Sequence, residues 1–397
     1  MQFTENCWEK VHNIRKSYLV LSIVLTGFIL SVVYHTVMAK VFGYDYYPYN
    51  TFLFWPEDRF NDFFNHFYRA KHLNPYYPPN LFTVYFPFTY FCVYLLTFLP
   101  AKVAFALLFG IFICSFAYYV FRNLPTSDYR GRISGVIILT FLSYPILFTL
   151  DRGNLEILVF LFLVLFVNYY QKGDDVKSVI FLSLAIAMKL YPGVFVVLFC
   201  ADKKYKNIIY TGILVLALSV LSAAVMEGGI QASLQGLQNN LGLFKEAYMR
   251  SVMGLHFNTS LYGAITILGK KFTFLSIVIK YYTVLALIAF ALISLFIVLT
   301  EKEFWRRVSL LVFMMLLLPQ VTFDYKMIHL YIALMLFLNS QKQSQYDIMY
   351  TILFGLLLIP KDYFLIKPDI SIAVFLNPLL MMLIAGTILL DRTSGRV

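Results

Sequence analysis

The sequence predicts an all-α polytopic membrane protein. Of its 397 residues, 60% are hydrophobic and 13% are charged, whereas about half of a typical soluble domain is apolar and about a quarter is charged. Several apolar runs approach or exceed the ~20 residues that span a bilayer as a helix. No Gly-, Ser- or Pro-rich linker divides the chain, so we expect one integral-membrane domain over residues 1–397.

Membrane topology explains the excess of basic residues. The formal net charge is +11, and Lys and Arg collect on the cytoplasmic side of membrane proteins. The sequence has no clustered basic domain, so nothing in it indicates nucleic-acid binding. The four cysteines have neither metal-binding nor paired spacing.

The first apolar run, residues 17–39, predicts an uncleaved membrane helix, because it is too long for a signal-peptide core. Lys10, Arg15 and Lys16 precede this run and predict a cytoplasmic N-terminus. Residues 40–80, which are rich in Tyr, Phe and Trp, would then form an outer loop.

The next apolar region is long enough for two spans, which would place Arg122 outside. Pro87 and Pro100 interrupt this region. We therefore favour the alternative in which residues 82–99 form an interfacial helix at the outer face. Residues 101–121 alone would then cross inward and keep Arg122 on the cytoplasmic side.

The rest of the chain predicts ten further crossings, about twelve in all, with both termini cytoplasmic. Their ranges are 133–149, 155–170, 178–188, 192–200, 207–226, 273–299, 308–318, 327–338, 347–359 and 372–390. Residues 1–226 would form a catalytic half that includes a first outer loop over 40–100, and residues 227–397 would carry the C-terminal helices. The segment 178–188 would cover only about 17 Å, so it must pack inside the protein or border a wet cavity.

Polar groups interrupt the apolar sequence at a few points, where an ionisable residue costs roughly 2.5–3.5 kcal/mol at a helix centre. The stretch FTLDRGNLEILVF (148–160) contains Asp151, Arg152, Asn154 and Glu156. An Asp–Arg helix cap is the structural interpretation. The functional interpretation is a phosphate or sugar site, because the planar guanidinium of Arg can donate two parallel hydrogen bonds to a phosphate.

The first outer loop contains PEDRFNDFFNHFYRA (56–70), in which Asp62 follows Glu57 and Asp58 among aromatic residues. Carboxylates beside aromatic rings suit a sugar, since rings stack on its apolar face and a carboxylate accepts hydroxyl protons. The alternative is a solvated acidic loop over an aromatic belt.

Lys189 lies in AIAMKLYPGVF (185–195), just before the helix break at Pro192. A lysine with wholly apolar neighbours needs an anion, which Glu156, Asp151 or a lipid-linked phosphate would supply.

Two further polar clusters are candidate functional residues. His256 and Asn258 occur in GLHFNTSL (254–261), and Asp324, Lys326 and His329 occur in QVTFDYKMIHLY (320–331). An Asp–Lys pair at a helix start, with His329 packed in the core, is the structural alternative. The predicted topology places all five polar clusters on the outer side, which favours one shared site.

Five segments resemble the GT-C glycosyltransferases, specifically glycosyltransferase family 87, which includes polyprenyl-phosphate-mannose-dependent mannosyltransferases. They are NDFFNHFYRAKHLNPYY (61–77), YFPFTYF (85–91), LDRGNLEILVFLFLVLF (150–166), LSLAIAMKLYPGVFVVLF (182–199) and TFDYKMIHLYIALMLF (322–337). The resemblance implies a GT-C membrane fold, a catalytic aspartate in the first extracytoplasmic loop and a lipid-phosphate sugar donor. Asp62 matches that aspartate, and Asp58 nearby is the alternative candidate.

The resemblance and the polar clusters together predict transfer of a hexose such as mannose from a polyprenyl phosphate to a glycan or lipid acceptor, with inversion. We expect the enzyme in a bacterial inner membrane, with no metal required, although the carboxylates could hold a divalent ion. The expected substrate-binding residues are Asp58, Arg152, Asn154, Glu156, Lys189, His256, Asn258, Asp324 and Lys326.

Other classes of membrane protein fit the sequence less well. A polysaccharide (O-antigen) polymerase should concentrate basic residues in two large outer loops, whereas here the outer charges are mixed. A glycolipid transporter needs access from both sides and gains no support from internal repeats. A structural scaffold leaves Lys189 unexplained.

Overall fold

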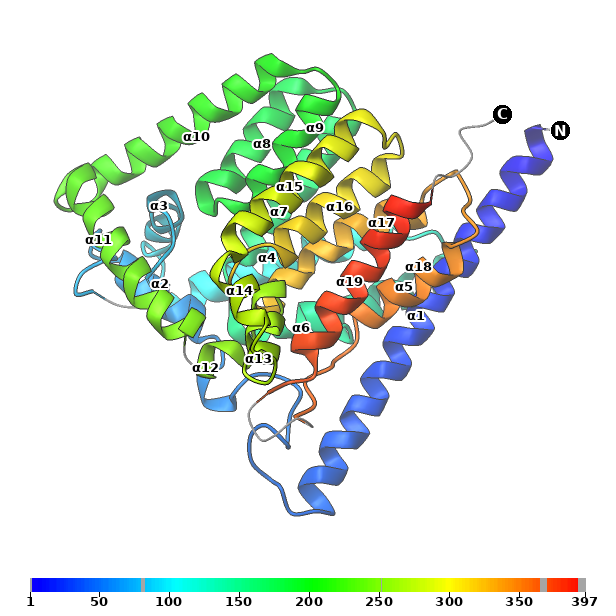
Figure 1. Cartoon of the computed structure of the whole chain (residues 1–397), viewed down its shortest axis with the longest axis horizontal. Coiled ribbons are helices and arrows are strands. Elements are labelled where there is room, and N and C mark those ends of the chain that lie inside the picture. Colours follow the sequence, from blue (N-terminus) through cyan, green and yellow to red (C-terminus); the bar gives the residue numbers. More distant parts are fainter. Residues whose placement is uncertain (1, 80–82, 251, 365–369, 392–397) are drawn as a thin grey trace.

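The computed structural model describes residues 2–79, 83–250, 252–364 and 370–391, and over these ranges the chain is helical without any β-strand (Figure 1). The prediction of an all-α membrane protein is confirmed. The elements up to residue 201 are α1 (Gln2–Lys40), η1 (Pro56–Asp58), α2 (Asn61–Ala70), α3 (Pro87–Leu96), α4 (Ala101–Asn123), α5 (Tyr129–Phe141), α6 (Tyr144–Arg152), α7 (Glu156–Gln171), α8 (Asp175–Met188), η2 (Tyr191–Phe195) and α9 (Val196–Ala201). The remainder are α10 (Tyr205–Val225), α11 (Gly229–Lys245), η3 (Glu246–Arg250), α12 (Val252–Leu255), α13 (Leu261–Gly269), α14 (Leu275–Lys280), α15 (Tyr282–Leu299), α16 (Phe304–Leu317), η4 (Asp324–His329), α17 (Leu330–Leu338), α18 (Asp347–Leu357) and α19 (Ala373–Leu390).

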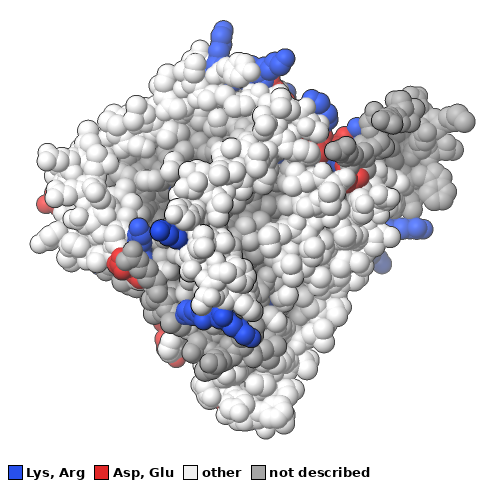
Figure 2. Space-filling view, in the orientation of Figure 1, with Lys and Arg blue, Asp and Glu red and all other residues white. Residues whose placement is uncertain are grey.

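Five helices are long and apolar enough to cross a membrane: α1 from His12 onward, α4, α10, α15 and α19. The pair α5 and α6, bent by 46°, is a sixth candidate. The surface shown in Figure 2 is accordingly almost free of charge outside a few patches. Each predicted crossing has a helix at its place, but the other helices are too short to span alone, so the number of twelve crossings stays a prediction.

One short helix, α16, lies inside the bundle. Every residue of α16 from Trp305 to Leu317 is buried, whereas only 11% of α15 is buried. A short helix surrounded by protein does not expose backbone polar groups to lipid. The packing of α16 therefore shows how a segment too short to span a bilayer is accommodated in this bundle.

The loop that carries η1 and α2, predicted to be the first outer loop, folds over one end of the bundle. Within the predicted range 82–99 a helix is observed, α3, which begins at Pro87, although residue 82 lies outside the described ranges. Its interfacial position stays a prediction. The buried residues of α2 are Phe63, His66, Phe67 and Ala70. Their spacing of three and four residues gives α2 one buried face.

Three helix breaks meet beneath this loop. Gly153 ends α6 with a φ of +64°, Lys189 is extended between α8 and η2, and η4 precedes α17. Because each break carries polar residues, three stretches far apart in the sequence bring polar groups to one end of the bundle.

Candidate active site

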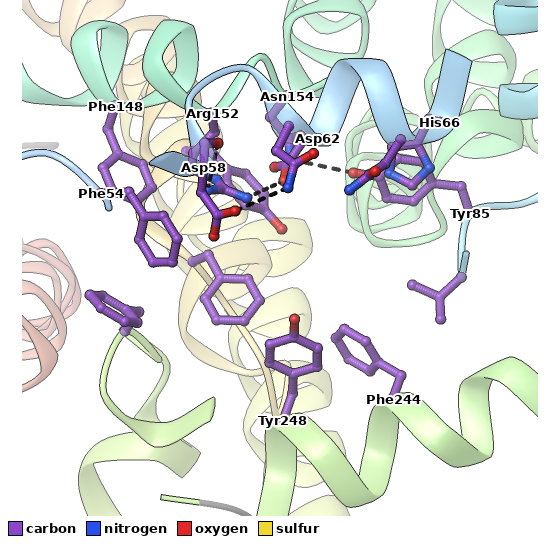
Figure 3. A pocket seen from close by; sticks show the side chains of 16 residues that line it. Phe54, Asp58, Asp62, His66, Tyr85, Phe148, Arg152, Asn154, Phe244 and Tyr248 are labelled. Carbon is purple, nitrogen blue, oxygen red and sulfur yellow. Dashed lines mark hydrogen bonds and ion pairs between the residues drawn. The ribbon is translucent and has the colours of Figure 1, made fainter. Parts of the chain in front are cut away.

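A cavity of about 240 Å³ lies between the loop that carries η1 and α2, the α6–α7 turn, η4 and the segment from α11 to α12 (Figure 3). Eight of its 16 lining residues are Phe or Tyr, and seven are polar or charged. The lining residues are Phe54, Asp58, Asn61, Asp62, Asn65, His66, Val84, Tyr85, Phe148, Arg152, Asn154, Phe244, Tyr248, Phe257, Phe323 and Tyr325.

Asp62 is the best-oriented carboxylate of this cavity. Arg152 Nη2 lies 2.5 Å from Asp62 Oδ1, and Asn154 Nδ2 donates to Asp62 Oδ2 at 2.7 Å. Asn154 Nδ2 also reaches the Tyr85 hydroxyl at 3.3 Å. A carboxylate has about four acceptor positions, so Asp62, 19% exposed, keeps acceptor capacity for a ligand hydroxyl.

Gly153 brings Arg152 and Asn154 to either side of Asp62. A Cβ at Gly153 would lie 3.0 Å from the backbone Cα of Phe60, and the φ of +64° disfavours any other residue. The Phe60 backbone N–H donates to the Asp151 carbonyl at 2.7 Å. The end of α6 therefore packs backbone to backbone against the start of α2.

The Arg152 guanidinium is fixed from two further directions. It lies 4.3 Å from the centroid of the Phe54 ring, and Nη1 donates to the Asp58 carbonyl at 3.3 Å. The Asp58 carboxylate accepts a hydrogen bond from Asn61 Nδ2 at 3.0 Å. Asp58 thus lines the same cavity as Asp62 but lacks the bonds from Arg152 and Asn154 to its carboxylate.

A second polar cluster lies directly behind the Tyr85 wall. Glu156 is fully buried and accepts from Lys189 Nζ at 2.6 Å and from the Tyr191 hydroxyl, while His329 Nε2 lies at 2.6 Å. Lys189 Nζ is also 4.5 Å from the Tyr85 ring centroid. The anion that Lys189 requires is therefore Glu156, and His329 is buried in the core but hydrogen-bonded.

Lys326 adds a second ammonium to this region. Its Nζ donates to the Val321 carbonyl at 3.2 Å and lies 4.7 Å from the Tyr191 ring centroid. In the part of the chain that the structure describes, no carboxylate forms an ion pair with Lys326. Glu156 balances one of the two lysines, so the cluster retains a net positive charge.

Six of the nine predicted substrate-binding residues do not line the cavity: Glu156, Lys189 and Lys326 belong to the second polar cluster, and the others are Asn258, Asp324 and His256. Asn258 accepts from the Thr322 backbone N–H at 3.0 Å and donates to the Gln320 carbonyl at 2.7 Å, which fixes the chain before η4. Asp324 accepts from the Tyr144 hydroxyl at 2.8 Å. His256 precedes the lining residue Phe257.

Sequence reasoning missed several lining residues, among them His66, Tyr85, Tyr248 and Tyr325. His66 follows Asp62 by one helical turn, so helical spacing could have found it. Its Nδ1 lies 3.2 Å from the Tyr90 hydroxyl. Burial lowers the pKa of His66 to about 4, which keeps the imidazole neutral at pH 7, and burial raises the pKa of Tyr248 to about 12.

The polar side chains of the cavity are of several chemical types and do not form a typical set of metal ligands. Within the described ranges, no group of three or more His, Cys, Asp or Glu side chains is placed to hold a metal ion. Asp62 and Asp58 are the carboxylates of the lining, and their neighbours are amides, an imidazole and a guanidinium. This arrangement can accept protons from hydroxyl groups and can stabilise negative charge.

Comparison with known proteins identifies the family. Residues 76–319 match the family model of glycosyltransferase family 87, a range that includes Arg152, Asn154 and Lys189 but not Asp62. No curated protein and no solved structure matches the chain. The matched range covers more than half of the sequence, and the apolar helices and cavity agree with a membrane transferase. The chain therefore belongs to glycosyltransferase family 87.

Proposed function

We propose that this membrane glycosyltransferase moves a hexose such as mannose from a polyprenyl phosphate to a hydroxyl of a glycan or lipid acceptor on the extracytoplasmic side. The observation that carries the proposal is the Asp62 carboxylate, which faces a sugar-sized, aromatic-lined cavity and is oriented by Arg152 and Asn154. Aromatic rings suit the apolar faces of sugars.

Asp62 acts as the general base in this proposal. It removes the proton of the acceptor hydroxyl as the oxygen attacks the anomeric carbon, and the lipid phosphate leaves from the opposite face. Attack opposite the leaving group inverts the anomeric configuration. Cations near the phosphate stabilise the charge that grows on it in a poorly hydrated site.

A lateral groove supports the lipid-linked donor. An apolar space of about 320 Å³ lies between α15, α16 and η2, and Tyr191 and Gln320 are among its lining residues. Tyr191 also contacts the Glu156 cluster, and Lys326 lies over its ring. The isoprenoid tail would lie in this groove, the phosphate beside Lys326, and the sugar in the cavity.

Arg152 and Lys189 are further candidate phosphate ligands, as the sequence predicted. Both already form an ion pair, Arg152 with Asp62 and Lys189 with Glu156. Lys326 forms no ion pair within the described ranges, so its positive charge is not balanced by a carboxylate. We therefore assign it the main phosphate contact. Asn258 and Asp324 would act indirectly, by holding the chain around η4.

The proposed topology has twelve crossings in a bacterial inner membrane, with both termini cytoplasmic and the cavity outside. The support is the distribution of Lys and Arg along the sequence. A reporter fused near residue 190 would test the sidedness, since cytosolic activity of the reporter would reverse the assignment.

The substitution Asp62→Asn tests the catalytic role. Loss of the base should lower sugar transfer by about 10²–10⁴-fold, because general-base catalysis contributes that much. Labelled polyprenyl-phosphate sugars incubated with purified enzyme measure the transfer. Asp58→Asn is the matched control, and we expect it to retain most activity. Wild-type transfer by a folded D62N variant, or equal losses in both variants, would remove Asp62 from the base role.

We propose that transfer needs no metal, because lysine and arginine side chains can neutralise the leaving phosphate. Treatment with a chelator should then change the rate less than about twofold. A chelator-induced loss that Mg²⁺ or Mn²⁺ restores would assign a divalent ion to Asp58 and Asp62 instead.

A further inference from the structure

The hairpin formed by α13 and α14 carries three exposed lysines, Lys270, Lys271 and Lys280. No ion pair is found for them in the described ranges, and no Asp or Glu occurs between Glu246 and Glu301. Figure 2 shows blue atoms over this part of a largely uncharged face. The hairpin is thus a site of uncompensated positive charge.

Exposed apolar side chains lie between Lys271 and Lys280. Phe272, Phe274 and Ile277 are 43%, 68% and 64% exposed. A short helical segment with exposed apolar side chains and lysines suits the boundary between lipid headgroups and acyl chains. The lysines can then reach lipid phosphates, while the aromatic rings lie deeper.

The hairpin packs beside the groove between α15 and α16. A Cβ at Gly269 would lie 2.6 Å from Ile279 Cδ1, so α13 and α14 pack closely. The Tyr262 and Tyr282 rings meet edge to face at 5.0 Å. Tyr282, which lines the groove, follows Lys280 by two residues.

We infer that the α13–α14 hairpin is a capture surface for the phosphate headgroup of the lipid-linked donor before the lipid enters the groove between α15 and α16. The inference rests on the proposed function for the identity of the donor. Three lysines concentrate a phosphate-bearing lipid near the surface, because each attracts an anionic headgroup over about a Debye length. The hairpin leads into the groove, so captured lipid needs to move only a short way.

The test compares full-length enzyme with the triple variant K270Q/K271Q/K280Q in phosphatidylcholine vesicles, where the donor is the main anionic lipid. We expect the KM for the donor to rise about tenfold at low salt and the kcat to stay unchanged. High salt should narrow the difference. The charge-conserving variant K270R/K271R/K280R should keep the wild-type KM. The control K172Q/K203Q/K206Q, with three exposed lysines at the other end of the bundle, should do the same.

The outcomes separate the two proposals. Wild-type transfer with an unchanged KM in the triple glutamine variant overturns the capture surface, and loss of co-purified phosphatidylglycerol in that variant would reassign the hairpin to bulk lipid. Absence of wild-type transfer counts against the proposed function instead. Binding of polyprenyl phosphate to wild type and variant then still tests the capture surface, and equal binding overturns it.

Discussion

Ion pairs occur at both ends of the helix bundle, and they differ in what surrounds them. At the cavity end, Asp62 pairs with Arg152 beside an open space. At the far end, Arg306 pairs with Asp391 at 2.5 Å, Arg307 with Asp202 at 3.0 Å, and Lys16 with Asp347 at 3.7 Å.

The far-end carboxylates find additional partners within the protein. Asp391 Oδ2 also accepts from Ser344 Oγ at 2.7 Å, and Asp202 Oδ2 accepts from the Tyr170 hydroxyl at 2.6 Å. These pairs join helices and leave little room for a ligand. Asp62 has free acceptor positions facing the cavity. A buried charge therefore does not mark a functional site unless a cavity borders it.

The largest expected contrast separates Arg152 from Arg306. Replacing Arg152 with Gln removes the guanidinium that orients Asp62, so transfer per folded molecule should fall about 100-fold. The thermal stability should change little, because cavity water can replace the lost bonds. Turnover and thermal unfolding in detergent measure the two effects.

Arg306→Gln should give the reverse result. Asp391 is buried, and leaving its charge unpaired costs about 3–5 kcal/mol. Molecules that remain folded should transfer sugar normally. Equal losses of stability and of turnover in R152Q and R306Q would mean that the two ends do not differ in role.

Glu156 and Lys189 sharpen the comparison, because they lie at the cavity end but form a closed pair. Glu156→Gln leaves two buried ammonium groups without a carboxylate, so we expect a loss of about 3 kcal/mol in stability. The double variant E156Q/K189M removes both charges and should recover most stability, with transfer within about threefold of wild type.

Donor affinity of the double variant decides between two roles for Lys189. A KM for the donor close to that of wild type means that Lys189 supports the wall behind Tyr85. Recovered stability with a donor KM raised about tenfold would make Lys189 a direct phosphate ligand, and the pair would then belong to the functional site.

The sequence predicted the order of the helices well, because long apolar runs and breaks at Pro and Gly are local signals. Pro87 at the start of α3 and the extended Lys189 are examples. It also singled out Asp62, Arg152 and Asn154, which line the cavity, since polar residues beside apolar runs are conspicuous. Their roles stay predictions.

Apart from Glu156, a candidate partner of Lys189 that the structure confirms, long-range pairing could not be predicted. Asp324 contacts the Tyr144 hydroxyl, which also bonds Asp362, and nothing in the sequence links these three positions. The far-end pairs were missed for the same reason, because Arg306 and Asp391 are 85 residues apart. The expectation that polar clusters gather on one side therefore overlooked a second set at the other end.

The smallest effect concerns His66 and the pH. Burial lowers its pKa to about 4, whereas an exposed histidine has a pKa of about 6.5. The unfolded chain thus binds the proton first, so His66 reduces the stability as the pH falls from about 6.5 to 4, by at most about 3 kcal/mol. Thermal unfolding in detergent across this range should show the decline, and His66→Gln should weaken it. An unchanged decline in H66Q would mean that His66 is not the source of the pH dependence, and that water in the cavity keeps the pKa of its imidazole near the ordinary value.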